Sequence, residues 1–238
     1  APGRNGFTLG FWEANRNGYR ILGHSGDIPQ FHANLYFAPE RGYGIFVALN
    51  ATGVAGRKLG SDLVRDSLAR GFFDRFVPGR VADEPTVAPQ QFDAERVAGY
   101  YRSTRHNVSG PQLERLFMGD DEVTAEADGT IAIASRLAPD GTPKRWRQVG
   151  PLTYREIGGQ AHLSFVADKD GRILYWIGDD YPPAMVFERV EGIFATGLVQ
   201  PLYWIALVSS TLFALGALVA WRRRAKGVRA ERSWTLSR

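Results

Sequence analysis

Cysteine is absent from the 238 residues, and methionine occurs only twice, as Met118 and Met185. Without cysteine the chain can form neither a disulfide nor a thiolate metal site, although this absence says little about its compartment. The first residue is alanine, and residues 1–6 lead directly into a strand pattern. We therefore expect a truncated part of a longer protein, with a cleaved signal peptide as the alternative.

A strong charge of one sign is also lacking outside the last residues. The formal net charge is +4. Residues 222–238 contain seven lysines and arginines and one glutamate, which gives them +6 and leaves −2 for residues 1–221. The basic character therefore belongs to the tail, and the sequence gives no general argument for a nucleic-acid partner.

A single long apolar run precedes this tail. Residues 197–221 are 25 residues without a formal charge. As a helix they extend about 37 Å, enough to cross a hydrocarbon core of ~30 Å with some tilt. Tyr203, Trp204 and Trp221 fit the aromatic belts at membrane interfaces. The arginines from residue 222 onward predict a cytoplasmic C-terminus, so that everything before the span lies outside the cytoplasm. A buried core helix is the alternative.

Residues 1–78 show the pattern of antiparallel strands followed by one helix. Apolar residues alternate over residues 7–12 and 31–37, as in half-buried strands, and Asn17-Gly18 between them predicts a tight hairpin. Residues 39–42 predict a turn. The continuous apolar run over residues 45–49 is typical of a strand covered on both faces.

The helix is expected after residue 53. Its apolar stripe consists of Leu59, Leu63, Leu68 and Phe72, with Val64 beside it. The charged residues of this segment are expected to face water, namely Arg57, Asp62, Arg65, Asp66 and Arg70.

Between the predicted strands lies the sequence His24-Ser25-Gly26-Asp27, which leads through Ile28-Pro29-Gln30 into the strand pair of residues 31–50. This segment resembles the last catalytic box and following hairpin of the serine hydrolases related to class C β-lactamases and penicillin-binding proteins. In that family a basic residue or histidine is followed by Ser, Thr or Gly and then by Gly. The resemblance covers roughly residues 5–77 and implies the C-terminal portion of an α+β hydrolase domain.

The chemistry of this box follows from its residues. A strand beside a nucleophile can direct a backbone N–H at the oxygen that becomes negative in acyl transfer, and Gly26 allows substrate to approach that backbone closely. The resemblance implies that the donor is the N–H of Asp27. His24 supplies a weaker, titratable charge in place of the usual lysine, and Ser25 could relay a proton or hold a substrate carboxylate. On residues alone, a turn with an ordinary histidine is the alternative.

The family's nucleophile box, Ser-x-x-Lys, normally lies far upstream, and the sequence Ser-x-x-Lys does not occur in this chain. The resemblance therefore implies a missing N-terminal part of the same domain as partner, and a peptide, amide or ester as substrate. Histidine in the box puts β-lactam recognition in doubt. The chain alone is expected to be inactive. Together with the span, the resemblance predicts a protein of the bacterial cytoplasmic membrane.

Residues 79–90 are polar, contain two prolines and predict a linker. Residues 91–190 resemble the lipocalin-like β-barrel that some members of the family carry behind the catalytic domain. Short strands bounded by turns are expected over residues 130–134, 144–149, 152–156, 162–166, 172–177 and 184–190.

No metal or cofactor is expected. The segment Asp168–Gly171 begins like a calcium loop but lacks the third acidic ligand, so a hairpin turn is favoured. His106 and His162 have no neighbours at metal-ligand spacing. The aromatic residues of the barrel favour a core over a ligand cavity, namely Tyr100, Tyr101, Trp146, Tyr154, Tyr175 and Trp176. A non-catalytic, membrane-tethered binding or sensor module is the alternative to a hydrolase.

Overall fold

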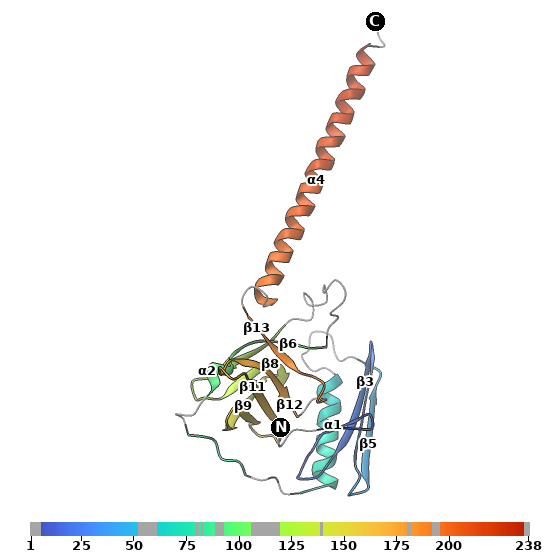
Figure 1. The fold of residues 1–238 in the computed structure, drawn as a ribbon. Helices are drawn as coiled ribbons and strands as arrows, with labels where there is room; N and C mark the ends of the chain where they lie inside the picture. The colour runs from blue at the N-terminus through green and yellow to red at the C-terminus, as the bar shows by residue number, and fades with distance from the viewer. Residues whose placement is uncertain are drawn as a thin grey trace.

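The computed structural model describes residues 6–51, 61–79, 81, 83–88, 93–105, 120–138, 140–179, 182–191 and 196–235. These residues form a five-stranded antiparallel sheet, a closed antiparallel barrel of eight strands and a long C-terminal helix (Figure 1). The predicted α+β class is confirmed at this level, with a sheet, an antiparallel barrel and one helix that could cross a membrane.

The sheet follows chain order, with β1 Phe7–Thr8, β2 Phe11–Glu13, β3 Leu22–Ile28, β4 Phe31–Ala38 and β5 Tyr43–Leu49. The single strand predicted over residues 7–12 is wrong, because a tight turn at Leu9-Gly10 divides it into β1 and β2. Both turn residues have positive φ, +44° and +87°. The predicted hairpin at Asn17-Gly18 is confirmed, with φ of +55° and +75°.

Strand β5 forms the edge of the sheet. Its side chains alternate between half-buried and exposed, and Phe46 is 66% exposed. The prediction that residues 45–49 are covered on both faces is therefore wrong. An apolar run indicates burial only when another layer lies on each side, and the described structure covers only one side of β5.

Helix α1, Ser61–Phe76, packs on one face of the sheet against β4 and β5. The predicted apolar stripe is wrong in part, because Val64 and Leu68 are exposed whereas Arg65 is buried. The inner side of α1 repeats every four residues as Arg65, Ala69 and Phe73, followed by Val77 just after the helix. Arg65 is buried because the polar groups of β3 and β4 beneath it accept its hydrogen bonds.

The barrel begins after the short helix α2, Ala94–Val97, and is closed by pairing of its last strand with its first. Its strands are β6 Gly99–Ser103, β7 Asp121–Ala125, β8 Ile131–Leu137, β9 Pro143–Gly150, β10 Thr153–Glu156, β11 His162–Ala167, β12 Ile173–Gly178 and β13 Phe187–Val190. The six predicted strands correspond to β8–β13, and β7 was not predicted.

The interior of the barrel is filled with side chains. Its fully buried aromatic residues are Tyr101, Trp146, Tyr154 and Trp176, each with 0% exposure. Tyr101 and Tyr154 pack edge to face against Phe165, whereas Trp176 stacks on Phe187. Four of the six predicted aromatic residues therefore belong to the core. Tyr100 is exposed and Tyr175 is half-buried.

Helix α1 lies between the sheet and the barrel (Figure 1). The contact is built around Asn17, whose N–H donates to Gln160 Oε1 at 2.8 Å and whose Oδ1 accepts from Gln160 Nε2 at 2.7 Å. The same asparagine donates to the carbonyls of Phe73 and Val77 at the end of α1. Arg70 of α1 adds an ion pair to Glu156 of the barrel at 3.8 Å, and Lys144 of the neighbouring barrel strand holds the same carboxylate at 2.8 Å.

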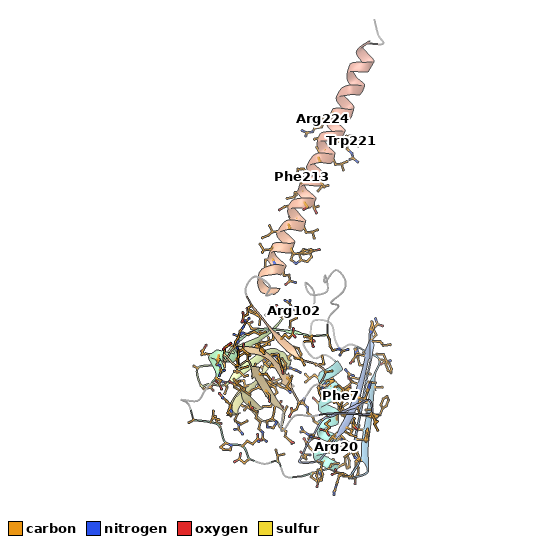
Figure 2. The ribbon with its side chains drawn as sticks, viewed as in Figure 1. Phe7, Arg20, Arg102, Phe213, Trp221 and Arg224 are labelled. Carbon is orange, nitrogen blue, oxygen red and sulfur yellow. The ribbon has the colours of Figure 1, made fainter. Side chains whose placement is uncertain are left out.

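Helix α4, Thr196–Thr235, contains a candidate membrane span from Gln200 to Arg224. None of its most apolar window is buried inside the structure, unlike the core helix of a soluble domain. Figure 2 shows Phe213, Trp221 and Arg224 in this order along a helix that extends away from the barrel and the sheet. Pro201 lies in its second turn, where it lacks the N–H that other helical residues donate to the carbonyl four positions earlier.

Candidate functional site

The four residues singled out in the sequence lie consecutively in the middle of β3. Cross-strand pairing places His24 opposite Leu35 and Gly26 opposite Ala33. Side chains alternate between the two faces of a strand, and Asp27 contacts Arg65 of α1. His24 and Gly26, which differ from Asp27 by an odd number of positions, therefore lie on the face turned away from α1, together with their paired residues. Asp27 lies on the other face, where it bonds to Arg65 of α1, and Ser25 shares that face. The box thus presents its two pairs of residues to opposite sides of the sheet.

One edge of β3 is open beside this box. Strand β2 pairs only with Leu22 and Gly23, and no described strand continues along the rest of this edge. The carbonyl of Ile21 accepts from the N–H of Ala14 on the β2 side. Backbone groups alternate in direction with a period of two, so the N–H groups of Ser25 and Asp27 point to the same side. These two N–H groups are directed away from β4, at the open edge.

His24 is exposed and contacts two aromatic rings. Its ring lies 5.2 Å from that of Trp12 at an angle of 33°, and 6.2 Å from that of Phe11, nearly perpendicular. Within the described residues no hydrogen bond or ion pair holds His24. Its imidazole nitrogens are therefore accessible to a group approaching from this face.

The sheet face that carries His24 is apolar, and no other element of the described residues covers it. Ile28, Phe31, Leu35 and Phe46 share this face by register, and each is exposed by 36% or more. A Cβ added to Gly26 would meet no atom within 4 Å. The space in front of Gly26 is thus open. Contiguous exposed apolar faces of this kind are uncommon on monomeric soluble proteins, and this one indicates an interaction site.

The opposite face of β3 carries a polar cluster that the sequence did not predict. Asp27 Oδ1 accepts from Arg65 Nη2 at 2.7 Å and lies 2.6 Å from His32 Nδ1. Arg65 Nη1 also donates to Asn34 Oδ1 at 2.8 Å and to the carbonyl of Ala33 at 3.0 Å. Through these bonds α1 holds in place the end of β3 that carries the Asp27 N–H, the candidate oxyanion donor. No sequence signal pairs Arg65 with Asp27, which lies 38 positions earlier.

His162 lies between two carboxylates, outside the box. Its Nε2 is 2.7 Å from Glu84 Oε2, and its Nδ1 is 3.1 Å from Asp179 Oδ2. The hydrogen bond to Asp179 raises the pKa of His162 against the opposing effect of burial, and the bond to Glu84 adds to the rise. Glu84 belongs to the predicted linker, which the contact ties to the barrel. His106 lies outside the described residues. No group of three potential ligands suited to a metal ion occurs in the described part of the chain.

A cavity of about 80 Å³ lies where α1 meets the barrel. Its lining combines apolar residues, such as Ile21 and Phe73, with charged and amide residues, namely Arg16, Asp66, Arg70, Glu156, Gln160 and Asp179. None of the four residues of the box lines it. The cavity and the box are therefore separate features.

No protein-family model matches the chain, and no curated protein matches its sequence. Among solved structures the chain is similar to SurE with D-Leu, at a TM-score of 0.38 and 18% identity, over 79% of this chain and 39% of that one. A second SurE structure gives 0.38 and 15%, over 80% and 40%. The octameric penicillin-binding protein homologue from Pyrococcus abyssi gives 0.26 and 13%, over 79% and 38%. The chain spans about two fifths of these structures, and likeness this distant assigns no family.

Proposed function

We propose that this chain is the C-terminal part of a membrane-anchored, extracytoplasmic serine hydrolase. In this proposal residues 1–78 belong to a domain like that of class C β-lactamases. A serine upstream of this chain attacks a peptide, amide or ester carbonyl, and water then cleaves the acyl-enzyme. The box of β3 binds the carbonyl oxygen while it carries negative charge.

The observation that carries the proposal is the open edge of β3. An oxyanion donor must be a backbone N–H that no neighbouring strand uses, in a place that substrate can reach. The N–H of Asp27 meets the first condition, because it points away from β4 and because β2, which runs antiparallel, begins only at Phe11 and pairs no further along β3 than Gly23. Gly26 meets the second, because nothing lies within 4 Å of the position of its absent Cβ.

The uncovered face of the sheet supports the same proposal. A nucleophile for this edge has to come from another layer, and the apolar side chains beside His24 form a surface for such a layer. Phe46 and Ile28 are the most exposed of them, at 66% and 64%. The N-terminal part of the same domain is the proposed cover, which would bring its serine next to His24 and the Asp27 N–H.

The barrel does not favour the alternative of a ligand-binding module. Its interior is occupied by the four aromatic side chains with 0% exposure, so a ligand could enter only by displacing side chains of the core. Its docking through Asn17 and Gln160 instead makes it a support for α1 and hence for the sheet. In the proposed topology α4 crosses the membrane with its arginines in the cytoplasm.

Turnover of p-nitrophenyl acetate and nitrocefin by the longer protein, including its upstream sequence, tests the proposal. The wild type should show saturable turnover, and the present chain alone should show none. His24→Ala should lower kcat/KM by about 10²-fold, as expected for a positioned proton-handling group. His24→Lys should recover part of the loss if a positive charge is what His24 supplies.

Loss of folding is the competing explanation for a slow His24 variant, so its melting temperature is measured beside its rate. An alanine variant with unchanged rate and unchanged melting temperature would show that His24 is an ordinary strand residue. Saturable turnover by the present chain, abolished by Ser25→Ala, would place the nucleophile in β3 and overturn the proposal.

A further inference from the structure

We propose that Arg65 is a positioning residue for the acyl-transfer site, acting through Asp27. It holds the end of β3 and compensates the carboxylate of the residue whose N–H binds the oxyanion. The inference rests on the proposed function, which supplies the role of that N–H.

The geometry is that of a guanidinium fork spanning two strands. The Arg65 side chain is 3% exposed, and its two terminal nitrogens contact Asp27 on β3 and both Ala33 and Asn34 on β4. His32 closes the cluster from β4, with Nδ1 at 2.6 Å from Asp27 Oδ1. Asp27 is thus held from α1 and from β4, on the face opposite the uncovered one.

A purely structural role explains this arrangement poorly. The residues that follow Arg65 on the inner side of α1 are apolar, namely Ala69, Phe73 and Val77. Burying a guanidinium costs desolvation, and apolar residues in place of a buried ion pair often leave stability unchanged or raise it. Arg65 is the polar residue in this apolar stripe, and it lies against the end of β3 that carries the Asp27 N–H.

The charge of Asp27 gives Arg65 a specific task. A carboxylate on the same residue as the donor N–H repels an oxyanion bound to that N–H. The positive charge of Arg65, 2.7 Å from Asp27 Oδ1, offsets this repulsion. Since the negative charge on the substrate oxygen develops in the transition state, losing Arg65 should lower kcat more than it changes KM.

Kinetics of the longer protein with p-nitrophenyl acetate test this task. Arg65→Met should lower kcat about tenfold and change KM less than threefold. Adding Asp27→Asn removes the uncompensated charge and keeps the N–H, so the double variant should regain kcat to within about threefold of wild type. Arg70→Met is the matched control, because Arg70 lies on the same helix but interacts with Glu156 and Asp74, away from β3. Its kcat should equal that of wild type.

Amide hydrogen exchange on the present chain in detergent provides a second readout that does not depend on activity. The N–H groups of Gly26 and Ile28 point to β4, so they report whether this end of β3 stays paired. Arg65→Met should speed their exchange about tenfold or more, whereas Arg70→Met should not.

The two readouts separate the inference from the proposed function. If the longer wild-type protein shows no turnover, the proposed function fails, and exchange alone decides whether Arg65 holds this strand. Unchanged exchange at Gly26 and Ile28 in Arg65→Met overturns the inference. In an active protein, unchanged kcat in Arg65→Met overturns it as well, and so does a loss of kcat that Asp27→Asn does not relieve.

Discussion

Among single residues, two buried tyrosines inside the barrel differ in the hydrogen bonding of their hydroxyl groups. The hydroxyl of Tyr101 donates to the carbonyl of Val97 at 2.7 Å. The hydroxyl of Tyr154 is equally buried and has no hydrogen-bond partner among the described residues. Burial raises the pKa of Tyr101 to about 12 and raises the pKa of Tyr154 even further above its usual range. Both hydroxyls are therefore neutral at pH 7.

We expect Tyr101→Phe to lower the free energy of unfolding by about 1 kcal/mol, through loss of a buried hydrogen bond. Tyr154→Phe should leave it unchanged or raise it by up to about 1 kcal/mol, since it removes a buried polar group without a partner. Urea unfolding of the two variants at pH 7 makes the comparison. An equal loss in Tyr154→Phe would mean that its hydroxyl has a bound partner, such as a water molecule.

Gly79 provides a second test, because it lies against the hairpin that joins the sheet to the barrel. A Cβ at this position would overlap the carbonyl oxygen of Asn17 and approach the ring of Tyr19 to 2.9 Å. We expect Gly79→Ala to destabilise the fold by roughly 1–3 kcal/mol, as overpacking does. Gly71→Ala is the control, since a Cβ there meets nothing within 4 Å and alanine favours the helix by ~0.5–1 kcal/mol. The melting temperature should fall in Gly79→Ala and rise in Gly71→Ala.

The burial of Arg65 could not be predicted from the sequence. The box His24–Asp27 could be singled out because its residue types and their order have a chemical meaning. The helical pattern, however, assigns charged residues to the solvent side, and Arg65 was expected there. Whether a charge is buried depends on acceptors from distant strands, here Asp27, Ala33 and Asn34. The local pattern contains no information about them.

At the scale of elements, strands bounded by clear turn residues were predictable. Asp128-Gly129, Asp140-Gly141 and Gly158-Gly159 each mark a turn in which a glycine has positive φ. Strand β7 was missed because Val123 and Ala125 are its only apolar residues, and two positions are too few to establish an alternation. The Leu9-Gly10 turn was missed for a different reason. Leucine rarely adopts positive φ, so the apolar alternation across it predicted a continuous strand.

The contact of His162 with Glu84 and Asp179 should make attachment of the linker to the barrel pH-dependent. Because the folded-state pKa of His162 is raised, its charged form stabilises the fold fully below the unfolded value of ~6.5. This stabilisation is lost as the pH rises through the folded-state pKa. The ion pair of Arg155 with Glu84, at 3.3 Å, retains part of the contact.

We expect the wild type to exceed His162→Gln in stability by about 1–2 kcal/mol near pH 5.5, which is toward the low end for a hydrogen bond to a charged group because the contact is partly exposed. The difference should shrink toward pH 8.5. Melting of the detergent-solubilised chain across this range measures it. A difference that stays constant with pH would show that the charge of His162 contributes nothing and that packing accounts for its effect.

At the scale of the whole molecule, the arrangement of the parts was not predictable. The junction depends on pairs far apart in sequence, such as Asn17 with Gln160 and Arg70 with Glu156. The open edge of β3 depends on where β2 begins, which is set by pairing and not by composition. The long apolar helix was predictable because a run of this length without charge has few other structures available. The structure extends it to Thr235, through most of the predicted tail.

The charges on the two sides of the apolar segment of α4 predict its orientation in the membrane. Arg222, Arg223 and Arg224 follow the apolar segment directly, whereas Glu188, Arg189 and Glu191 on the other side are mixed in sign. Since basic residues near a span are retained in the cytoplasm, we expect residues 1 to about 195 outside and the C-terminus inside. In the longer protein, alkaline phosphatase fused after Val190 should be active, and green fluorescent protein fused after Arg238 should fluoresce. Changing the three arginines to alanine should weaken both signals, with replacement of Arg16, Arg20 and Arg41 as the control. Fluorescence of a green fluorescent protein fused after Val190 would reverse the orientation and place the box in the cytoplasm, which an extracytoplasmic hydrolase does not allow.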